Sequence, residues 1–133
     1  MQLEQKIDGF LAQGPFAVVG ASRDREKYGN KVLRVYLQRG LRVFPVNPRE
    51  TEVEGLPCYA DLISLPEPVH ALSIVTPPAV TEKIIEQAAP AGIKYVWMQP
   101  GSESAAAVRR AEELGMVVIA GGPCVLRTLG YRE

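Results

Sequence analysis

A turn of small residues near the N-terminus has the composition of a phosphate-binding loop. Gly20-Ala21-Ser22 follows a short apolar run and precedes an amphipathic segment that begins near Gly29-Asn30. Small side chains let a phosphate approach the backbone, and the amides that start a helix supply donors and a positive dipole. Arg23 and Lys27 add positive charge, and Asn30 could cap the helix or hold a ligand. The full dinucleotide pattern G-x-G-x-x-G is absent, so a surface loop leading into a capped helix is the alternative.

The end of the second apolar run indicates which nucleotide such a loop would take. It reads Pro45-Val46-Asn47-Pro48-Arg49, with no carboxylate until Glu50. A site for NAD places Asp or Glu here to hold the ribose hydroxyls. A basic residue suits a phosphorylated ribose instead. Plain NAD is therefore disfavoured, and NADP, with its 2′-phosphate, and coenzyme A, with its 3′-phosphate, remain.

Groups for catalysis and metal binding are scarce. The chain has one histidine, His70, which precedes the third apolar run and is expected at the edge opposite the phosphate loop. Of two cysteines, Cys124 follows a glycine-rich turn and is either a reactive thiol or a small buried side chain. No pair of carboxylates has a spacing that calls for acid–base chemistry. We therefore expect no catalytic residue and no metal site.

The composition is that of one folded globular domain. The 133 residues include 15 basic and 15 acidic side chains, so the formal net charge is zero, and 47% of residues are hydrophobic. Zero net charge gives no electrostatic attraction to nucleic acid or to anionic membranes. No apolar run is long enough to span a membrane, and the N-terminus lacks the pattern of a signal peptide. We expect a single cytoplasmic domain over residues 1–133.

Short apolar runs alternate with helical patterns along the chain. The runs that predict strands are Phe16–Gly20, Leu41–Val46, Ala71–Val75, Tyr95–Met98 and Met116–Ala120. The stripes that predict helices lie in residues 3–11, 32–37, 80–88 and 107–114, and a short helix is expected in residues 56–68. This alternation predicts a Rossmann-like, doubly wound α/β domain with a five-stranded parallel sheet covered by helices on both faces. We expect the strand order 3-2-1-4-5.

The connections differ at the two ends of this sheet. Helix-to-strand turns are tight, whereas the strand-to-helix loops are longer and more polar. Those loops leave the carboxyl ends of the strands, where open parallel sheets bind ligands. With the expected order, the crevice lies between the loops after strands one and four.

Motifs along nearly the whole chain carry a specific resemblance. These motifs include Ala17–Ser22, Tyr28–Val32, Pro45–Pro48, Ser73–Ala79 and Gln99-Pro100-Gly101. With them, the chain resembles the small bacterial and archaeal CoA-binding proteins of the YccU type, which are related to the N-terminal CoA-binding domain of the succinyl-CoA synthetase α subunit. The phosphate loop is less glycine-rich than that of the synthetase. The last strand ends in Gly121-Gly122-Pro123-Cys124, where the family often has Asp-Arg-Cys.

The resemblance implies a pose for coenzyme A. The phosphates would lie on the Gly20-Ala21-Ser22 turn, and the adenosine with its 3′-phosphate would lie beside Asn47, Pro48 and Arg49. The resemblance also brings Lys27, Thr76, Pro77, Pro78, Gln99 and Gly101 to the site. Arg23, Tyr28 and Asn30, in and beside the first loop, complete the candidate set.

These observations favour a binding module over an enzyme. The leading hypothesis is a carrier or sensor of coenzyme A or an acyl-CoA. The alternatives are an NADP-linked reductase or a minimal acyl-CoA enzyme that acts as a homodimer, and a regulatory domain that has lost its ligand. A homodimer or another protein is a candidate partner, and nucleic acid and membrane are not.

Overall fold

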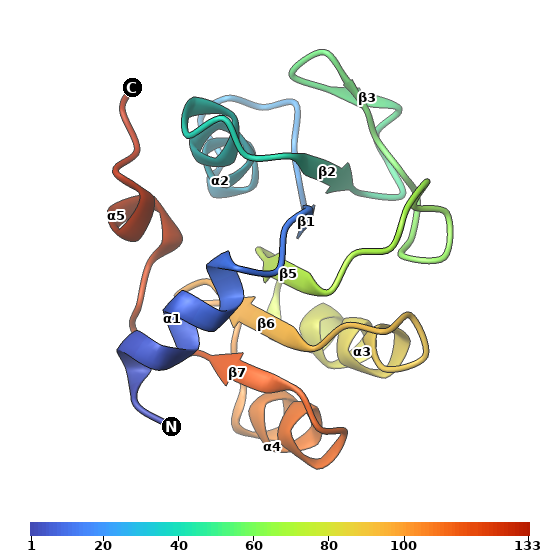
Figure 1. Ribbon diagram of the computed structural model, residues 1–133. Coiled ribbons are helices and arrows are strands. Elements are labelled where there is room, and N and C mark those ends of the chain that lie inside the picture. The colour runs from blue at the N-terminus through green and yellow to red at the C-terminus, as the bar shows by residue number, and fades with distance from the viewer.

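The computed structural model describes all 133 residues, from Met1 to Glu133 (Figure 1). Its main sheet holds the parallel strands β1 (Phe16–Val19), β2 (Val43–Val46), β5 (Ala71–Ile74), β6 (Tyr95–Met98) and β7 (Val117–Ile119). The helices are α1 (Leu3–Leu11), α2 (Tyr28–Gln38), α3 (Pro78–Ala88), α4 (Ala105–Glu113) and α5 (Val125–Leu129). The predicted doubly wound α/β class and five-stranded parallel sheet are confirmed. No helix is both long and apolar enough to cross a membrane.

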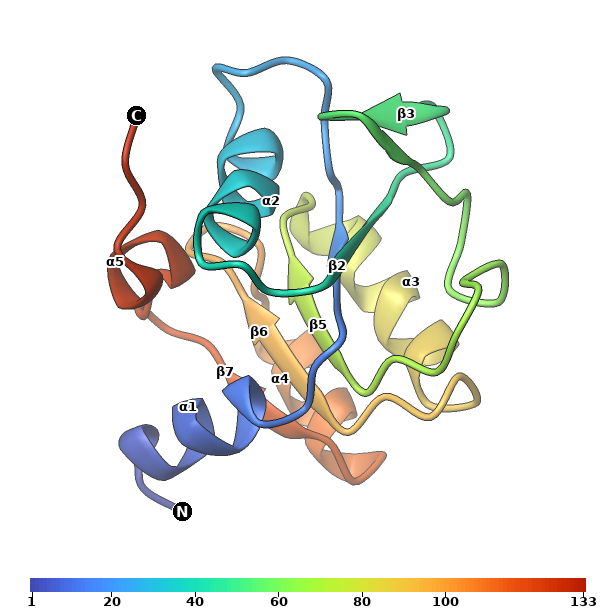
Figure 2. The same cartoon turned by 45° about the horizontal axis from the view of Figure 1, so that its top comes forward.

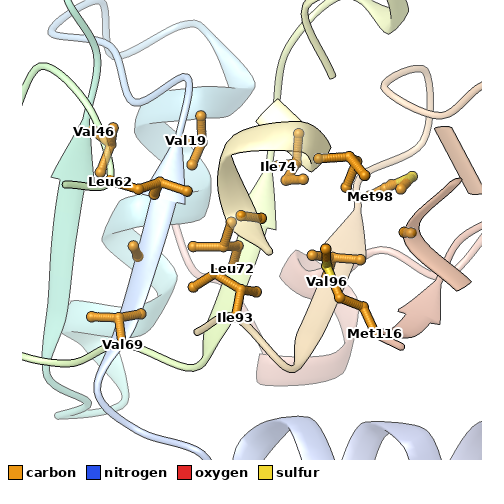
Figure 3. Close-up of a cluster of buried hydrophobic side chains, with 14 of the residues drawn as sticks. Val19, Val46, Leu62, Val69, Leu72, Ile74, Ile93, Val96, Met98 and Met116 are labelled. Atoms are coloured by element: carbon orange, nitrogen blue, oxygen red, sulfur yellow. The ribbon is translucent and has the colours of Figure 1, made fainter. Parts of the chain in front are cut away.

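Two apolar clusters lie on opposite faces of the sheet because successive strand residues point to opposite sides. One cluster joins alternate strand residues such as Val19 and Ile74 to α3 and α4, with Ile85 and Ala107 fully buried (Figure 3). The other packs Phe16, Val18 and their counterparts against α1, α2 and α5. Figure 2 shows the sheet separating the two groups of helices. Strands β1, β2 and β5 are buried at every position, which explains their nearly uninterrupted apolar runs.

The strand order corrects the sequence-based expectation. The sheet runs β2-β1-β5-β6-β7, which in order of the parallel strands is 2-1-3-4-5 rather than 3-2-1-4-5. Pro45 gives a physical reason. A proline cannot donate to a sheet ladder, so it is tolerated on an edge strand and not between two neighbours. On the outer side of β2, Pro45 contributes an acceptor and no donor: its carbonyl oxygen accepts a hydrogen bond from the Tyr59 amide at 3.0 Å.

The segment between β2 and β5 also differs from expectation, because it contains no helix. It forms a small hairpin of β3 (Glu52–Val53) and β4 (Leu56–Pro57), followed by turns and bends. Glu54 and Gly55 have φ values of 49° and 78°, as a two-residue turn between twisted strands requires. Prolines at 57, 66 and 68 oppose a helix here. The short helix α5 was not predicted from the sequence.

Candidate functional site

The observed strand order places the crevice between the loops after β1 and β5. These strands are neighbours, and the helices that follow them, α2 and α3, cover opposite faces of the sheet (Figure 2). Loops that leave such a switch point diverge and open a crevice at the carboxyl edge. The expected edge is correct, but the expected position beside the fourth parallel strand is wrong, because the third strand lies next to the first.

Two glycines let the end of β1 approach its neighbours closely. Gly20 has φ 92°, and a Cβ atom built on it would lie 2.0 Å from the Val75 carbonyl oxygen. A Cβ atom on Gly29, in the first turn of α2, would lie 2.0 Å from the Gly20 carbonyl oxygen. The sequence identified Gly20 as the start of the loop, whereas the contact between Gly20 and Gly29 emerges only from the folded chain.

This close approach gathers backbone donors at the crevice. The amides of Ser22, Tyr28 and Gly29, which line the crevice, form no hydrogen bond within the protein. The N-cap residue Lys27 makes no side-chain capping bond, and the first turn of α2 holds no acidic residue. Unpaired amides and the positive end of the helix dipole favour an anion at this position.

The loop after β2 is tied to the loop after β1. The Asn47 Nδ2 group donates to the Ala21 carbonyl at 2.8 Å, while its Oδ1 accepts from the Arg49 amide at 2.9 Å. The Glu50 carboxylate accepts from the Arg23 amide at 2.7 Å. The Arg49 guanidinium takes no part in these bonds. It has no partner within the protein, and Arg49 lines the crevice.

The main crevice has a volume of about 970 Å³. Nine of the predicted site residues line it: Gly20, Ser22, Lys27, Tyr28, Asn47, Pro48, Arg49, Thr76 and Pro77. Its far wall comes from α3 and the segment before β5, and sequence reasoning missed these residues: Ala60, Asp61, Leu62, Val80, Lys83, Ile84 and Gln87. Only the correct strand order, which places α3 beside the β1 loop, could have identified them.

A second pocket, of about 610 Å³, adjoins the crevice and shares Tyr28, Val75, Thr76 and Pro77 with it. The predicted residues Gln99 and Gly101 line this pocket, together with Cys124. Cys124 is half-buried, and its Sγ accepts a hydrogen bond from Gln99 Nε2 at 3.2 Å. The thiol is therefore part of a pocket wall rather than a fully buried apolar group.

Four predicted site residues lie outside both pockets. Ala21 and Asn30 are fully buried. Asn30 is neither the cap of α2 nor exposed to a ligand: its Nδ2 donates to the Ser22 carbonyl at 2.8 Å and so supports the loop from beneath. Arg23 lines a separate shallow pocket, and Pro78 is the exposed first residue of α3.

The single histidine lies where the sequence places it. His70 precedes β5 at the amino edge of the sheet, and its Nδ1 is 2.9 Å from the Gly92 carbonyl oxygen. This edge is opposite the crevice, so the imidazole is remote from the proposed ligand.

Gln99 anchors the C-terminal helix to the pocket. Its side chain is 3% exposed, and its Oε1 accepts from the Val125 amide at 2.8 Å. We expect Gln99→Leu to lower the free energy of unfolding by about 1–2 kcal/mol, because a buried backbone donor loses its partner. Urea unfolding measures this, with the exposed Gln87→Leu as the control. Equal stability of the two variants would contradict the anchoring role.

Most of the chain matches a known protein family. A family model described as the CoA binding domain matches residues 15–128. The chain belongs to the CoA binding domain family. The resemblance found in the sequence is thereby confirmed, and its motifs are those that form the β1 loop, the β2 loop and the second pocket.

Proteins similar to this chain include both much longer enzymes and a chain of similar length. The α subunit of acetate–CoA ligase [ADP-forming] II from Pyrococcus furiosus is 33% identical over 91 residues, which are 68% of this chain and 20% of that subunit. A hypothetical protein from Pyrococcus horikoshii OT3 has 31% identity and a TM-score of 0.88, over 96% of this chain and 89% of its own.

A third similar structure belongs to a larger chain. The dinucleotide forming acetyl-coenzyme A synthetase 1 of Ca. Korarchaeum cryptofilum, in complex with phosphate and ADP, has 33% identity and a TM-score of 0.72. The match covers 82% of this chain and 26% of that one. The chain spans only 10 to 20% of the length of the curated relatives it matches.

Proposed function

We propose that this protein binds coenzyme A or an acyl-CoA at the carboxyl edge of its sheet, as a non-catalytic carrier or sensor. The observation that carries the proposal is the crevice at the switch point, which is lined by Ser22, Tyr28 and Gly29 with their unpaired amides and also by Lys27 and Arg49. Amides and free cations in one crevice are the donor set that a polyphosphate ligand requires. Membership of the CoA binding domain family supports coenzyme A as that ligand.

In the proposed pose the diphosphate lies over the Gly20-Ala21-Ser22 turn and the first turn of α2. The adenosine and its 3′-phosphate lie beside Asn47, Pro48 and Arg49. The pantetheine arm then passes Thr76 and Pro77, which border both cavities, and ends in the second pocket beside Gln99 and Gly101. The four lining residues that the two cavities share support this path, since coenzyme A is too long for a compact pocket.

A titration by calorimetry, with coenzyme A, NADP and ATP in parallel, tests the proposal. We expect coenzyme A to bind most tightly, because only it matches both the basic loop after β2 and the second pocket. At a concentration of one hundred times Kd it should add about 2.7 kcal/mol to the free energy of unfolding.

Absence of coenzyme A binding at millimolar concentration would overturn the proposal. Binding of NADP alone, followed by NADPH oxidation in a substrate screen, would instead favour the reductase. If the protein is a carrier or sensor, we expect it to bind coenzyme A without catalysing any reaction.

The proposal includes the organisation and setting of the protein. We propose that residues 1–133 act as one domain, since both apolar clusters combine residues from the first and the last strands of the sheet. We also propose a cytoplasmic location, which fits the two free cysteines, Cys58 and Cys124, because disulfides are rare in reducing compartments.

A further inference from the structure

Three elements bring unpaired cations to the main crevice. Lys27 precedes α2, Arg49 lies in the loop after β2, and Lys83 lies on α3; all three line the crevice. None forms an ion pair within the protein. Three free positive charges in one crevice are notable in a chain whose formal net charge is zero.

The two carboxylates in the same wall already have partners. Glu50 accepts from the Arg23 amide at 2.7 Å, and Asp61 accepts from the Ser64 amide and hydroxyl at 2.9 and 2.7 Å. The hydrogen bonds from Ser64 hold the pKa of Asp61 below its usual value. Neither carboxylate is within ion-pair distance of Lys83, so its charge is available to a ligand.

The position of Lys83 on α3 places it in the wall of the crevice. Val80, Lys83, Ile84 and Gln87 all line the crevice, at the spacing of one helix face. The lining also includes Leu62, which is buried in the same apolar cluster as Ile85 of α3. An apolar surface with one ammonium group suits a base and a nearby phosphate.

We propose that Lys83 binds the 3′-phosphate of coenzyme A together with Arg49, and that this pair makes the crevice selective for 3′-phosphorylated adenine nucleotides. This inference rests on the proposed function. The 3′-phosphate is a monoester, so it carries close to two negative charges at pH 7, and two cations match it. Lys27 stays with the diphosphate, because it immediately precedes the unpaired amides of Tyr28 and Gly29.

Calorimetric titration with coenzyme A and dephospho-coenzyme A tests the assignment. We expect Lys83→Met, which keeps an apolar stem of similar length, to weaken coenzyme A binding by roughly tenfold or more and to leave dephospho-coenzyme A binding unchanged. Lys83→Arg should retain most of the preference. Lys94→Met is the matched control, since Lys94 is exposed at the amino edge of the sheet and lines neither cavity.

Adenosine 3′,5′-bisphosphate and adenosine 2′,5′-bisphosphate serve as fragment probes. The wild type should prefer the 3′ isomer, and Lys83→Met should lose that preference. An equal loss of affinity for coenzyme A and dephospho-coenzyme A in Lys83→Met would overturn the assignment, as would an unchanged preference. A wild type that binds neither coenzyme overturns the proposed function itself. If the wild type binds coenzyme A tightly and Lys83→Met binds it with the same affinity, only the role of Lys83 is overturned.

Discussion

Replacement of Gly29 by alanine is expected to weaken coenzyme A binding by roughly a hundredfold and to destabilise the fold. In most helices this change would be stabilising by about 1 kcal/mol. Here the new Cβ atom would lie 2.0 Å from the Gly20 carbonyl oxygen, which is a backbone atom and cannot rotate away. The end of β1 and the start of α2 must therefore separate, and such overpacking costs about 1–3 kcal/mol.

The same separation would disrupt the phosphate donors. The free amide of Ser22 belongs to one side of the contact, and those of Tyr28 and Gly29 belong to the other. Losing two charge-assisted hydrogen bonds, at about 1.5 kcal/mol or more each, accounts for the hundredfold effect. Chemical denaturation and coenzyme A titration measure the two expected losses.

Gly40→Ala is the control for this change. Gly40 follows α2 at the opposite end and has φ 69°, but nothing lies within 4 Å of a Cβ atom there. Backbone strain should cost about 1 kcal/mol of stability while the affinity for coenzyme A stays unchanged. A Gly29→Ala protein that is more stable than wild type and binds normally would show that the close contact is dispensable.

Replacement of Arg49 by glutamate is expected to weaken coenzyme A binding by roughly 10- to 100-fold without loss of stability. The guanidinium lines the crevice and has no hydrogen-bond or ion-pair partner within the protein, so the folded state loses no contact. The bound state loses at least one charge-assisted contact, of about 1.5–3 kcal/mol, and gains a repulsive carboxylate. Titration of the variant with coenzyme A gives the affinity, and urea unfolding gives the stability.

Arg109→Glu is the matched control, because it makes the same change of net charge at an exposed position of α4. It should bind coenzyme A like the wild type. If both variants lose affinity equally, the effect is a long-range one of net charge, and Arg49 is not a contact. If Arg49→Glu retains full affinity, the proposed position of the adenosine is wrong.

Local patterns were sufficient for the strands of the main sheet and for part of the candidate site. The five apolar runs became the five strands of the main sheet because a strand buried on both faces has to be apolar throughout. The edge that carries the ligand loops followed from the lengths and polarity of the connections. The Gly20-Ala21-Ser22 turn and Arg49 were found because small residues and basic residues are local signals at the ends of strands.

The hairpin and the strand order show where local patterns were misread. Glu54-Gly55 between two short segments is a hairpin turn, but the spacing of Tyr59, Leu62 and Leu65 suggested a helix in residues 56–68 instead. Pro45 in the second strand was a local sign of an edge position. Because a proline cannot donate a ladder hydrogen bond, Pro45 argues against an order in which the second strand lies between the first and the third.

The turn of small residues after β1, the basic loop after β2 and the parallel α/β class were determined by the sequence alone, because each depends on residues close together in the chain. Tertiary structure decided three further features: the contact between Gly20 and Gly29, the wall that the two cavities share and the place of Lys83 in the crevice. These depend on which strands are hydrogen-bonded neighbours. That pairing sets segments far apart in the chain side by side, and no single segment encodes it.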